Sequence, residues 1–288
     1  MVTIDFSDLK PIKNSTDKIP AIGLGTWKIG GDFVPDYSKD PLWIDALRYG
    51  IEYSIEKIGF VLIDTAELYG GGHAEELIGE AIKDLPREKI FIVTKVKSEN
   101  LRYERVLKSA KASLERLKTD YIDLYLIHWP NPRIPLSETM RALEKLYNEG
   151  IVRYIGVGNF DVHLMEEART YLSATDIIAN QIKYSLLDRH AEKEIIPYCQ
   201  KEKIIVMAYT PLERGEVMRL EILRKLAGKY GKSPAQIALN WLISKPFVVT
   251  IPKAEKKKHI KENIDTMGWR LREEDLKLLD ELDVYKIS

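Results

Sequence analysis

FVLIDTAELYGGGHAEELIGEAIKDLPREKIFIVTK, residues 60–95, is the stretch that decides the fold. It begins with an apolar run, FVLIDTA (60–66), continues through a segment of helical period, AEELIGEAIKDL (74–85), and ends in a second apolar run, IFIVTK (90–95). Apolar runs without polar alternation, joined by a helix, are typical of parallel strands that are buried on both faces. The stretch therefore predicts one β–α–β unit.

The same alternation of apolar runs and amphipathic stretches recurs along the chain. The helical stretches include 104–117, 136–150 and 233–245, the last of which opens on Ser233 as an N-cap with proline at the first helical position. Eight apolar runs are predicted as strands, at 21–27, 60–66, 90–95, 121–128, 152–159, 177–184, 204–210 and 248–253. Eight successive units predict an α/β fold, a (β/α)8 TIM barrel, with residues 1–288 forming a single domain.

Two segments fall outside this repeat. The N-terminal pieces VTIDF (2–6) and PIK (11–13) are predicted to form a β-hairpin that plugs one end of the barrel, and REEDLKLLDEL (272–282) is predicted as an extra C-terminal helix. A third stretch, 28–41, is rich in turn-forming residues and too long for a minimal connection, so it is expected to arch over the open end.

The composition argues against several classes of partner. The chain has 44 basic and 44 acidic residues, so no net charge favours nucleic acid or an anionic membrane, and a small-molecule substrate is expected. The single cysteine, Cys199, cannot form an internal disulfide and suits a reducing compartment. No apolar stretch is long enough to span a bilayer, and the first ten residues lack the features of a signal peptide, so a cytoplasmic location is predicted.

Polar side chains follow the predicted strands at the ends that meet at one mouth of such a barrel. Asp64 lies at the end of the second strand with Tyr69 just beyond it, Lys95 ends the third, and His128 ends the fourth. Each alone has a structural explanation, as a helix cap, a packing aromatic, a solvated cation or a buried imidazole. Together they favour a catalytic site, because a lysine at the end of an apolar strand needs a neutralising partner such as Asp64.

These residue types suit the reduction of a carbonyl group. A phenol is a weak acid at neutral pH, and Lys95 is expected to lower the pKa of Tyr69 by stabilising its phenolate. Tyr69 can then protonate the alkoxide that hydride addition forms, and His128 can donate a second hydrogen bond to the same oxygen. The other histidines show no spacing typical of metal ligands, and no metal is expected.

The hydride needs a cofactor, but the glycine-rich fingerprint of dinucleotide-binding folds is absent. Asn159 and Gln181, at neighbouring strand ends, can hold a carboxamide, and Tyr209 offers a ring on which a nicotinamide can stack. The alternative is that these polar groups only bond to one another along the rim of the barrel.

Eight motifs occur in an order known from one family: GLGTW (23–27), IDTAELYG (63–70), TK (94–95), LIHWP (126–130), IGVGNF (155–160), NQIKY (180–184), AYTPL (208–212) and IPKAEKKKHIKEN (251–263). In these motifs the chain resembles the aldo-keto reductases, from Gly23 to about Leu271. The resemblance implies a catalytic tetrad of Asp64, Tyr69, Lys95 and His128. Tyr69 is then the acid in carbonyl reduction and the base in alcohol oxidation.

The resemblance also implies NADPH or NADH as cofactor, a small carbonyl or alcohol substrate, and a monomer. The cofactor contacts that it implies are Gly25, Thr26, Trp27, Asp64, Asn159, Gln181, Tyr209, Thr210, Pro211, Leu212, Lys253, Ala254, His259, Glu262 and Asn263. The substrate contacts that it implies are Trp27, Tyr69, His128 and Trp129.

The phosphate-binding motif departs from the family pattern. Lys253 is kept, but Ala254 replaces the usual serine and His259 replaces an arginine. A mostly neutral imidazole cannot replace the bidentate grip of a guanidinium on a 2′-phosphate, so both NADH and NADPH are expected to serve. The Lys-Ala…His arrangement and TMGWRL (266–271) are similar to archaeal alcohol-dehydrogenase-like members. The alternative function is a barrel that binds the cofactor as a redox sensor without turnover, which the complete tetrad disfavours.

Overall fold

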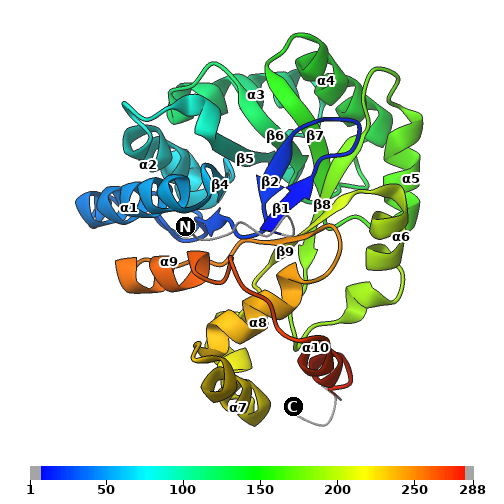
Figure 1. The fold of residues 1–288 in the computed structure, drawn as a ribbon. Coiled ribbons are helices and arrows are strands. Elements are labelled where there is room, and N and C mark those ends of the chain that lie inside the picture. Colours follow the sequence, from blue (N-terminus) through cyan, green and yellow to red (C-terminus); the bar gives the residue numbers. More distant parts are fainter. Residues whose placement is uncertain (1–7, 283–288) are drawn as a thin grey trace.

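The computed structural model describes residues 8–282, and its centre is a parallel sheet of eight strands in chain order. The first and last strands of the sheet are joined by two bridge pairs, Ile22 with Thr250 and Gly25 with Lys253. The amide of Gly23 also donates to the carbonyl oxygen of Thr250 at 2.8 Å. The sheet therefore closes on itself, and the predicted (β/α)8 TIM barrel is confirmed (Figure 1).

Each barrel strand lies at the apolar run predicted for it. The strands are β3 (Leu24–Gly25), β4 (Val61–Asp64), β5 (Ile90–Val96), β6 (Ile122–Ile127), β7 (Val152–Gly158), β8 (Ile177–Lys183), β9 (Ile205–Tyr209) and β10 (Val248–Thr250). The strands β4, β5 and β6 are buried along their whole length, because side chains pack inside the barrel and helices cover its outside. The main difference is β3, where only two residues of the predicted run pair with β4.

The helices form a ring around the sheet (Figure 1). They are α1 (Asp40–Ile58), α2 (His73–Ala81), α3 (Tyr103–Leu117), α4 (Leu136–Asn148), α5 (Val162–Thr170), α6 (Ile195–Glu202), α7 (Glu221–Tyr230), α8 (Pro234–Ile243), α9 (Lys257–Ile264) and α10 (Glu273–Asp280). Helix α8 begins as predicted: the Ser233 hydroxyl accepts from the Gln236 amide at 3.2 Å, and the Gln236 side chain accepts from the Ser233 amide at 3.1 Å. Helix α10 confirms the predicted C-terminal helix.

A β-hairpin closes one end of the barrel, but its strands differ from those predicted. It pairs β1 (Leu9–Pro11) with β2 (Lys18–Pro20), whereas VTIDF (2–6) lies outside the described residues. The hairpin residues Ile12 and Ile19 are buried in the cluster of apolar side chains that fills the barrel interior. The hairpin therefore serves as the expected plug.

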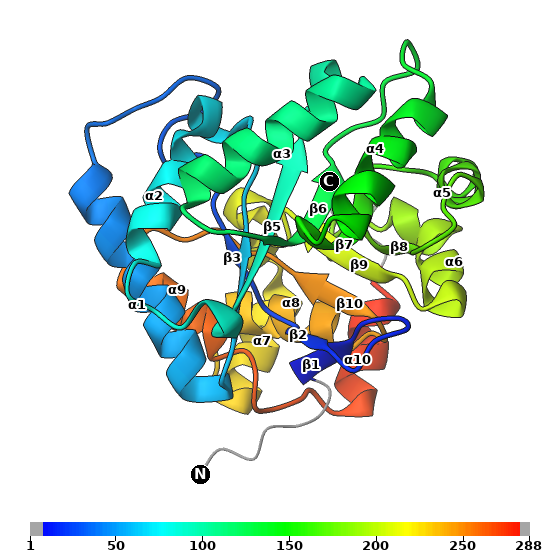
Figure 2. The ribbon, with the colours of Figure 1, turned by 90° about the horizontal axis from the view of Figure 1, so that it is seen from above.

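The segment before α1 lies at the opposite end of the barrel from the hairpin (Figure 2). It is fastened beside the short 3-10 helix Tyr69–Gly72, because the Gly70 amide donates to the carbonyl oxygen of Asp32 at 2.8 Å. Within residues 8–282, none of the helices combines the length and the apolar composition that crossing a bilayer requires.

Candidate active site

The candidate catalytic side chains come from three neighbouring strands and meet at the end of the barrel away from the hairpin. Asp64 is the last residue of β4, Lys95 is the last but one of β5, and His128 directly follows β6. Tyr69 opens the 3-10 helix that follows β4. The parallel register of the three strands brings these residues to one mouth.

Lys95 is the centre of this group. Its Nζ donates to Oδ2 of Asp64 at 2.9 Å, to the hydroxyl of Tyr69 at 3.1 Å and to the carbonyl oxygen of Thr65 at 2.7 Å. The side chains of Lys95 and Asp64 are only 1% and 3% exposed. All three ammonium protons thus have acceptors inside the protein, which is what a buried charge requires.

The surroundings of Lys95 favour its charged form, although burial also raises the pKa of its partner Asp64. Burial alone lowers the pKa of a lysine, but the adjacent Asp64 carboxylate and Tyr69 raise that of Lys95 above its ordinary value. The Asp64 carboxylate is itself fixed from the other side, where Nε2 of Gln181 on β8 donates to its Oδ1 at 2.7 Å. A charged pair is therefore held rigidly against the Tyr69 hydroxyl.

The expectation that Tyr69 has a lowered pKa is wrong for this structure. Burial raises the pKa of Tyr69 above its ordinary value, and although Lys95 lowers it, Asp64 raises it again. The physical reason is that Lys95 and Asp64 form a nearly neutral pair, so little net positive charge faces the phenol. Tyr69 therefore keeps its proton throughout the neutral range.

His128 is a neutral imidazole. Burial, together with the nearby Lys95 charge, lowers its pKa to about 3. Its Nδ1 is buried without a hydrogen-bond partner among the described residues. Its ring packs edge-to-face on that of Tyr69, with centroids 5.7 Å apart. A neutral imidazole ring has one N–H to donate.

The predicted carboxamide ligands lie together at the next strand ends. The backbone amide of Asn159 donates to the backbone carbonyl oxygen of Gln181 at 2.8 Å. The side-chain Nδ2 of Asn159 donates to the backbone carbonyl oxygen of His128 at 3.1 Å. The Tyr209 hydroxyl donates to Oδ1 of Asn159 at 3.0 Å. Asn159 has φ 60°, a left-handed conformation that asparagine adopts more readily than most residues other than glycine.

The sequence of the chain matches a known family. The family model of the Aldo/keto reductase family matches residues 21–284. The chain belongs to the aldo-keto reductase family. Among characterised relatives, methylglyoxal reductase YeaE of Escherichia coli is 38% identical over 277 residues, which cover 94% of this chain and 94% of that protein.

Two solved aldo-keto reductases have nearly the same fold. The thermostable aldo-keto reductase Tm1743, solved with the inhibitor epalrestat, is 46% identical with a TM-score of 0.88, covering 94% of this chain and 98% of that one. The enzyme of Klebsiella pneumoniae, solved with NADP and acetate, is 35% identical with a TM-score of 0.84, covering 95% and 94% of the two chains. The fold and the family are thus established together.

In this aldo-keto reductase the segment that follows β10 carries the predicted phosphate ligands. Lys253 and His259 are exposed, and each is paired with a nearby carboxylate, Lys253 with Glu255 and His259 Nδ1 with Glu262 at 3.1 Å. Asn263, predicted to contact the cofactor, is buried. Lys253 and His259 therefore lie on the rim, at the solvent edge of the mouth.

The remaining predicted cofactor contacts lie on the walls of the mouth. The Thr26 hydroxyl is buried and donates to the carbonyl oxygen of Asp64 at 2.8 Å, so it links β3 to β4. A Cβ at Gly25 would lie 2.5 Å from the carbonyl oxygen of Ile251, so only glycine allows β3 to approach the end of β10 this closely. After β9, Thr210 adopts a left-handed φ of 53° and leads into Pro211 and Leu212.

The predicted substrate contacts form an aromatic edge of the mouth. Trp27 packs edge-to-face on Tyr69, with centroids 4.9 Å apart, and Trp129 is 48% exposed. Phe33, which the sequence did not single out, packs edge-to-face on Trp27 at 5.4 Å and is 59% exposed. An apolar rim of this kind favours uncharged, partly apolar substrates.

Two contacts of the tetrad were also missed. The Thr65 carbonyl that receives Lys95, and the Gln181 side chain that fixes Asp64, became visible only once the strands were closed into a barrel. Gln181 lies 117 residues from Asp64, and no spacing in the sequence indicates their contact. The described residues contain no group of three or more histidine, cysteine, aspartate or glutamate side chains arranged to hold a metal ion.

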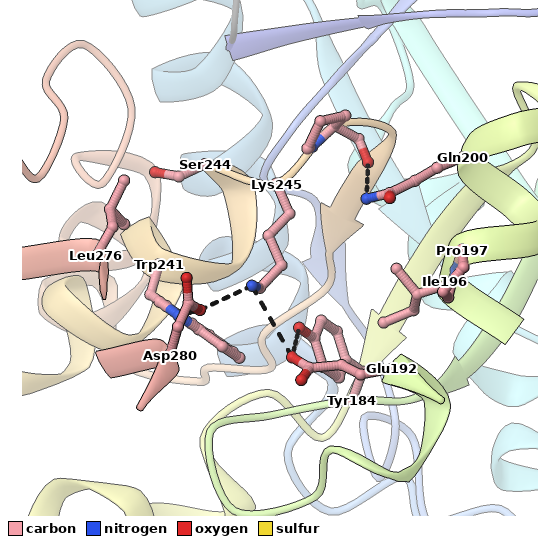
Figure 3. Close-up of a pocket in the computed structure, with 11 residues that line it drawn as sticks. Tyr184, Glu192, Ile196, Pro197, Gln200, Trp241, Ser244, Lys245, Leu276 and Asp280 are labelled. Atoms are coloured by element: carbon pink, nitrogen blue, oxygen red, sulfur yellow. Dashed lines mark hydrogen bonds and ion pairs between the residues drawn. The ribbon is translucent and has the colours of Figure 1, made fainter. Parts of the chain in front are cut away.

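A cavity of about 400 Å³ lies elsewhere, between α6, α8 and α10 (Figure 3). The charged groups in it are paired with one another: Lys245 with Asp280 at 3.0 Å and with Glu192 at 3.9 Å, while the Tyr184 hydroxyl donates to Glu192 at 2.5 Å. None of the residues that line it belongs to the tetrad. Its polar groups satisfy each other and point to no ligand.

Proposed function

We propose that the chain acts as one barrel domain that reduces aldehydes and ketones to alcohols with NADPH or NADH, and catalyses the reverse oxidation of secondary alcohols and diols. In this proposal Tyr69 is the general acid in reduction and the general base in oxidation. The observation that carries it is the contact of Lys95 Nζ with the Tyr69 hydroxyl at 3.1 Å inside a buried site. Such an arrangement has a chemical use and little structural benefit.

The proton step depends on residues of this chain. A bound nicotinamide supplies the hydride, and the Tyr69 hydroxyl then gives its proton to the alkoxide oxygen that results. Its raised pKa does not prevent this, because an alkoxide is a much stronger base than a phenolate. Lys95 stabilises the phenolate that remains, and the neutral His128 donates a hydrogen bond that orients the carbonyl oxygen. In oxidation the same groups act in the reverse order.

The donor set fits a nicotinamide. Asn159 and Gln181 bring two side-chain amides to adjoining strand ends, and the half-buried Tyr209 ring lies beside them. These groups would hold the carboxamide and stack on the ring. The Klebsiella pneumoniae relative was solved with NADP, which supports a nicotinamide cofactor. Use of NADH as well is proposed because Ala254 and His259 replace a hydroxyl and a guanidinium.

Small, uncharged carbonyl compounds are the proposed substrates. The relative from Escherichia coli is a methylglyoxal reductase, and the rim of this mouth is formed by Trp27, Phe33 and Trp129. An aromatic rim of this kind accepts an apolar substituent on the carbonyl carbon.

The experiment is a screen of aldehydes, ketones and diols with NADPH and NADH, followed at 340 nm, for the parent and Tyr69→Phe. We expect Tyr69→Phe to lose activity by about 10²–10⁴-fold, the usual contribution of a general acid. Tyr171→Phe, which removes an exposed hydroxyl beside α5, is the matched control and should keep full activity. If Tyr69→Phe turns over as fast as the parent, the mechanism is wrong. Cofactor binding without turnover of any substrate would instead favour a redox sensor.

A further inference from the structure

The rim segment, defined here as residues 253–263, has carboxylates paired with several of its basic side chains. Glu255 is hydrogen-bonded to Nζ of Lys253, and Glu262 pairs with His259. Lys257 reaches across to Asp45 of α1, with Nζ and Oδ1 2.8 Å apart. A 2′-phosphate that approaches the rim segment would therefore meet two lysines, Lys253 and Lys257, that already have carboxylate partners.

Lys253 is the member of the rim segment that the barrel holds most firmly. Its backbone pairs with Gly25 of β3, and the Gly25 amide donates to the carbonyl oxygen of Pro252 at 3.2 Å. The next residue, Ala254, packs its methyl group against the apolar cluster under α1 and α9. The backbone at Lys253 is thus fixed, while its exposed side chain can exchange Glu255 for another anion.

We propose that Glu255 determines the choice between NADH and NADPH, by occupying Lys253 and by keeping a negative charge beside the position of the 2′-phosphate. This inference rests on the proposed use of a nicotinamide cofactor. Glu255 is not among the residues predicted to contact the cofactor, and it lies two positions after the lysine that is.

Glu255 and a 2′-phosphate compete for a single ammonium, that of Lys253. A 2′-phosphate gains from Lys253 only if it displaces the Glu255 carboxylate, and it then bears the repulsion of that carboxylate. A 2′-hydroxyl carries no charge and can donate a hydrogen bond to a carboxylate, so NADH meets no such repulsion. Glu255 therefore weakens NADPH selectively.

Two other cations of the rim segment, Lys256 and Lys258, favour a phosphate and oppose this effect. Both are exposed. Exposed charges are screened by salt over roughly 10 Å and contribute little each. The side chains of Lys253 and Glu255 are 31% and 43% exposed, so their pairing is also partly screened. We therefore expect an effect of severalfold and not of many orders of magnitude.

The test measures binding of the adenosine half of each cofactor, without catalysis. Calorimetric titrations with 2′,5′-ADP and with 5′-AMP compare the parent, Glu255→Gln, the double variant Glu255→Gln/Lys253→Met, and Glu166→Gln. Glu166 is an exposed acid on α5, so Glu166→Gln removes the same charge on another side of the barrel. Full-length NADP⁺ and NAD⁺ are titrated into the same four proteins.

We expect Glu255→Gln to bind 2′,5′-ADP about fivefold more tightly, the effect of removing one nearby charge in a mostly aqueous setting. Binding of 5′-AMP should stay within about twofold, and the same contrast should appear between NADP⁺ and NAD⁺. The double variant should lose the gain, because the ammonium that Glu255→Gln releases is absent. Glu166→Gln should match the parent for every ligand.

The inference is overturned if Glu255→Gln leaves the preference for 2′,5′-ADP over 5′-AMP unchanged, or if it tightens both ligands equally. It is also overturned if the double variant keeps the gain, since Lys253 is then not the group released. These outcomes differ from failure of the proposed function, in which the parent binds neither NADP⁺ nor NAD⁺; that result removes both proposals together.

Discussion

Two lysines of the barrel mouth are each paired with a carboxylate, yet the two pairs differ in every physical respect. Lys95 and Asp64 come from neighbouring strands and are 1% and 3% exposed, whereas Lys253 and Glu255 lie two residues apart on one loop and are 31% and 43% exposed. The first pair also holds Tyr69 and the Thr65 carbonyl. The second pair has no further hydrogen-bond partner among the described residues, although the charge of Lys39 also acts on Glu255.

The difference shows which charged residues of the mouth can be substituted without loss of stability and which cannot. A buried pair costs several kcal/mol per ion in lost hydration, so each partner depends on the other and neither can be exchanged alone. A pair at the surface is worth about 0–1 kcal/mol, so its members can be replaced without harm to the fold. The buried Lys95 pair is thus hard to change, while the exposed Lys253 pair, where we propose that cofactor choice is made, can be changed.

The largest effect is expected when the buried pair is broken. Lys95→Met leaves the Asp64 carboxylate unpaired among apolar strands, and we expect it to lower the free energy of unfolding by about 3–5 kcal/mol. Urea unfolding at pH 7, followed by circular dichroism, measures the change. The double variant Lys95→Met/Asp64→Leu removes both charges and should recover much of the loss. A single variant as stable as the parent would contradict the description of this pair as buried and interdependent.

A smaller effect is expected from acid at the same end of the site. The folded chain holds His128 neutral down to about pH 3, whereas the unfolded chain binds the proton near the ordinary pKa of about 6.5. Between these values the unfolded state binds more protons, so His128 destabilises the fold as the pH falls below about 6.5, and the loss grows until the folded pKa is reached. From pH 7 to pH 4 this amounts to about 2–3 kcal/mol.

The measurement is the free energy of unfolding against pH for the parent and His128→Gln. All other groups titrate in both proteins, so the difference between the curves isolates His128. The parent should lose about 2–3 kcal/mol more than the variant between pH 7 and pH 4. Parallel curves would show that His128 is either charged or well solvated in the folded protein.

The fold was predictable because the strands are apolar runs, and because the apolar residues of the helices recur with the period of an α-helix. The meeting of Asp64, Lys95 and His128 was predictable because they lie at the ends of successive strands of one parallel sheet, and in such a barrel those ends must meet. The hairpin was predicted correctly as a plug, but its strands Leu9–Pro11 and Lys18–Pro20 were not recognised, since such short pairs leave little periodicity. The predicted segment VTIDF (2–6) lies outside the described residues.

The sequence alone could not predict the direction of a pKa shift that has several opposing causes. The pKa of Tyr69 depends on burial, on Lys95 and on Asp64 together, and its direction follows only when all three are placed. The contact of Gln181 with Asp64 spans 117 residues and has no local signal. Glu255 is a different case. The sequence shows that it lies two positions after Lys253, but only the structure shows that the two side chains form an ion pair.

The smallest effect is expected when the same substitution is made at the exposed end. Lys253→Met breaks the pair with Glu255, but the carboxylate left behind stays in water, so the free energy of unfolding should change by no more than about 0.5–1 kcal/mol. Urea unfolding beside Lys95→Met gives a direct comparison of one chemical change in two settings. A loss at Lys253→Met as large as that at Lys95→Met would mean that the rim pair supports the closure of β3 on β10. Glu255 could then not act through charge alone, because any change at the rim would also move the wall of the mouth.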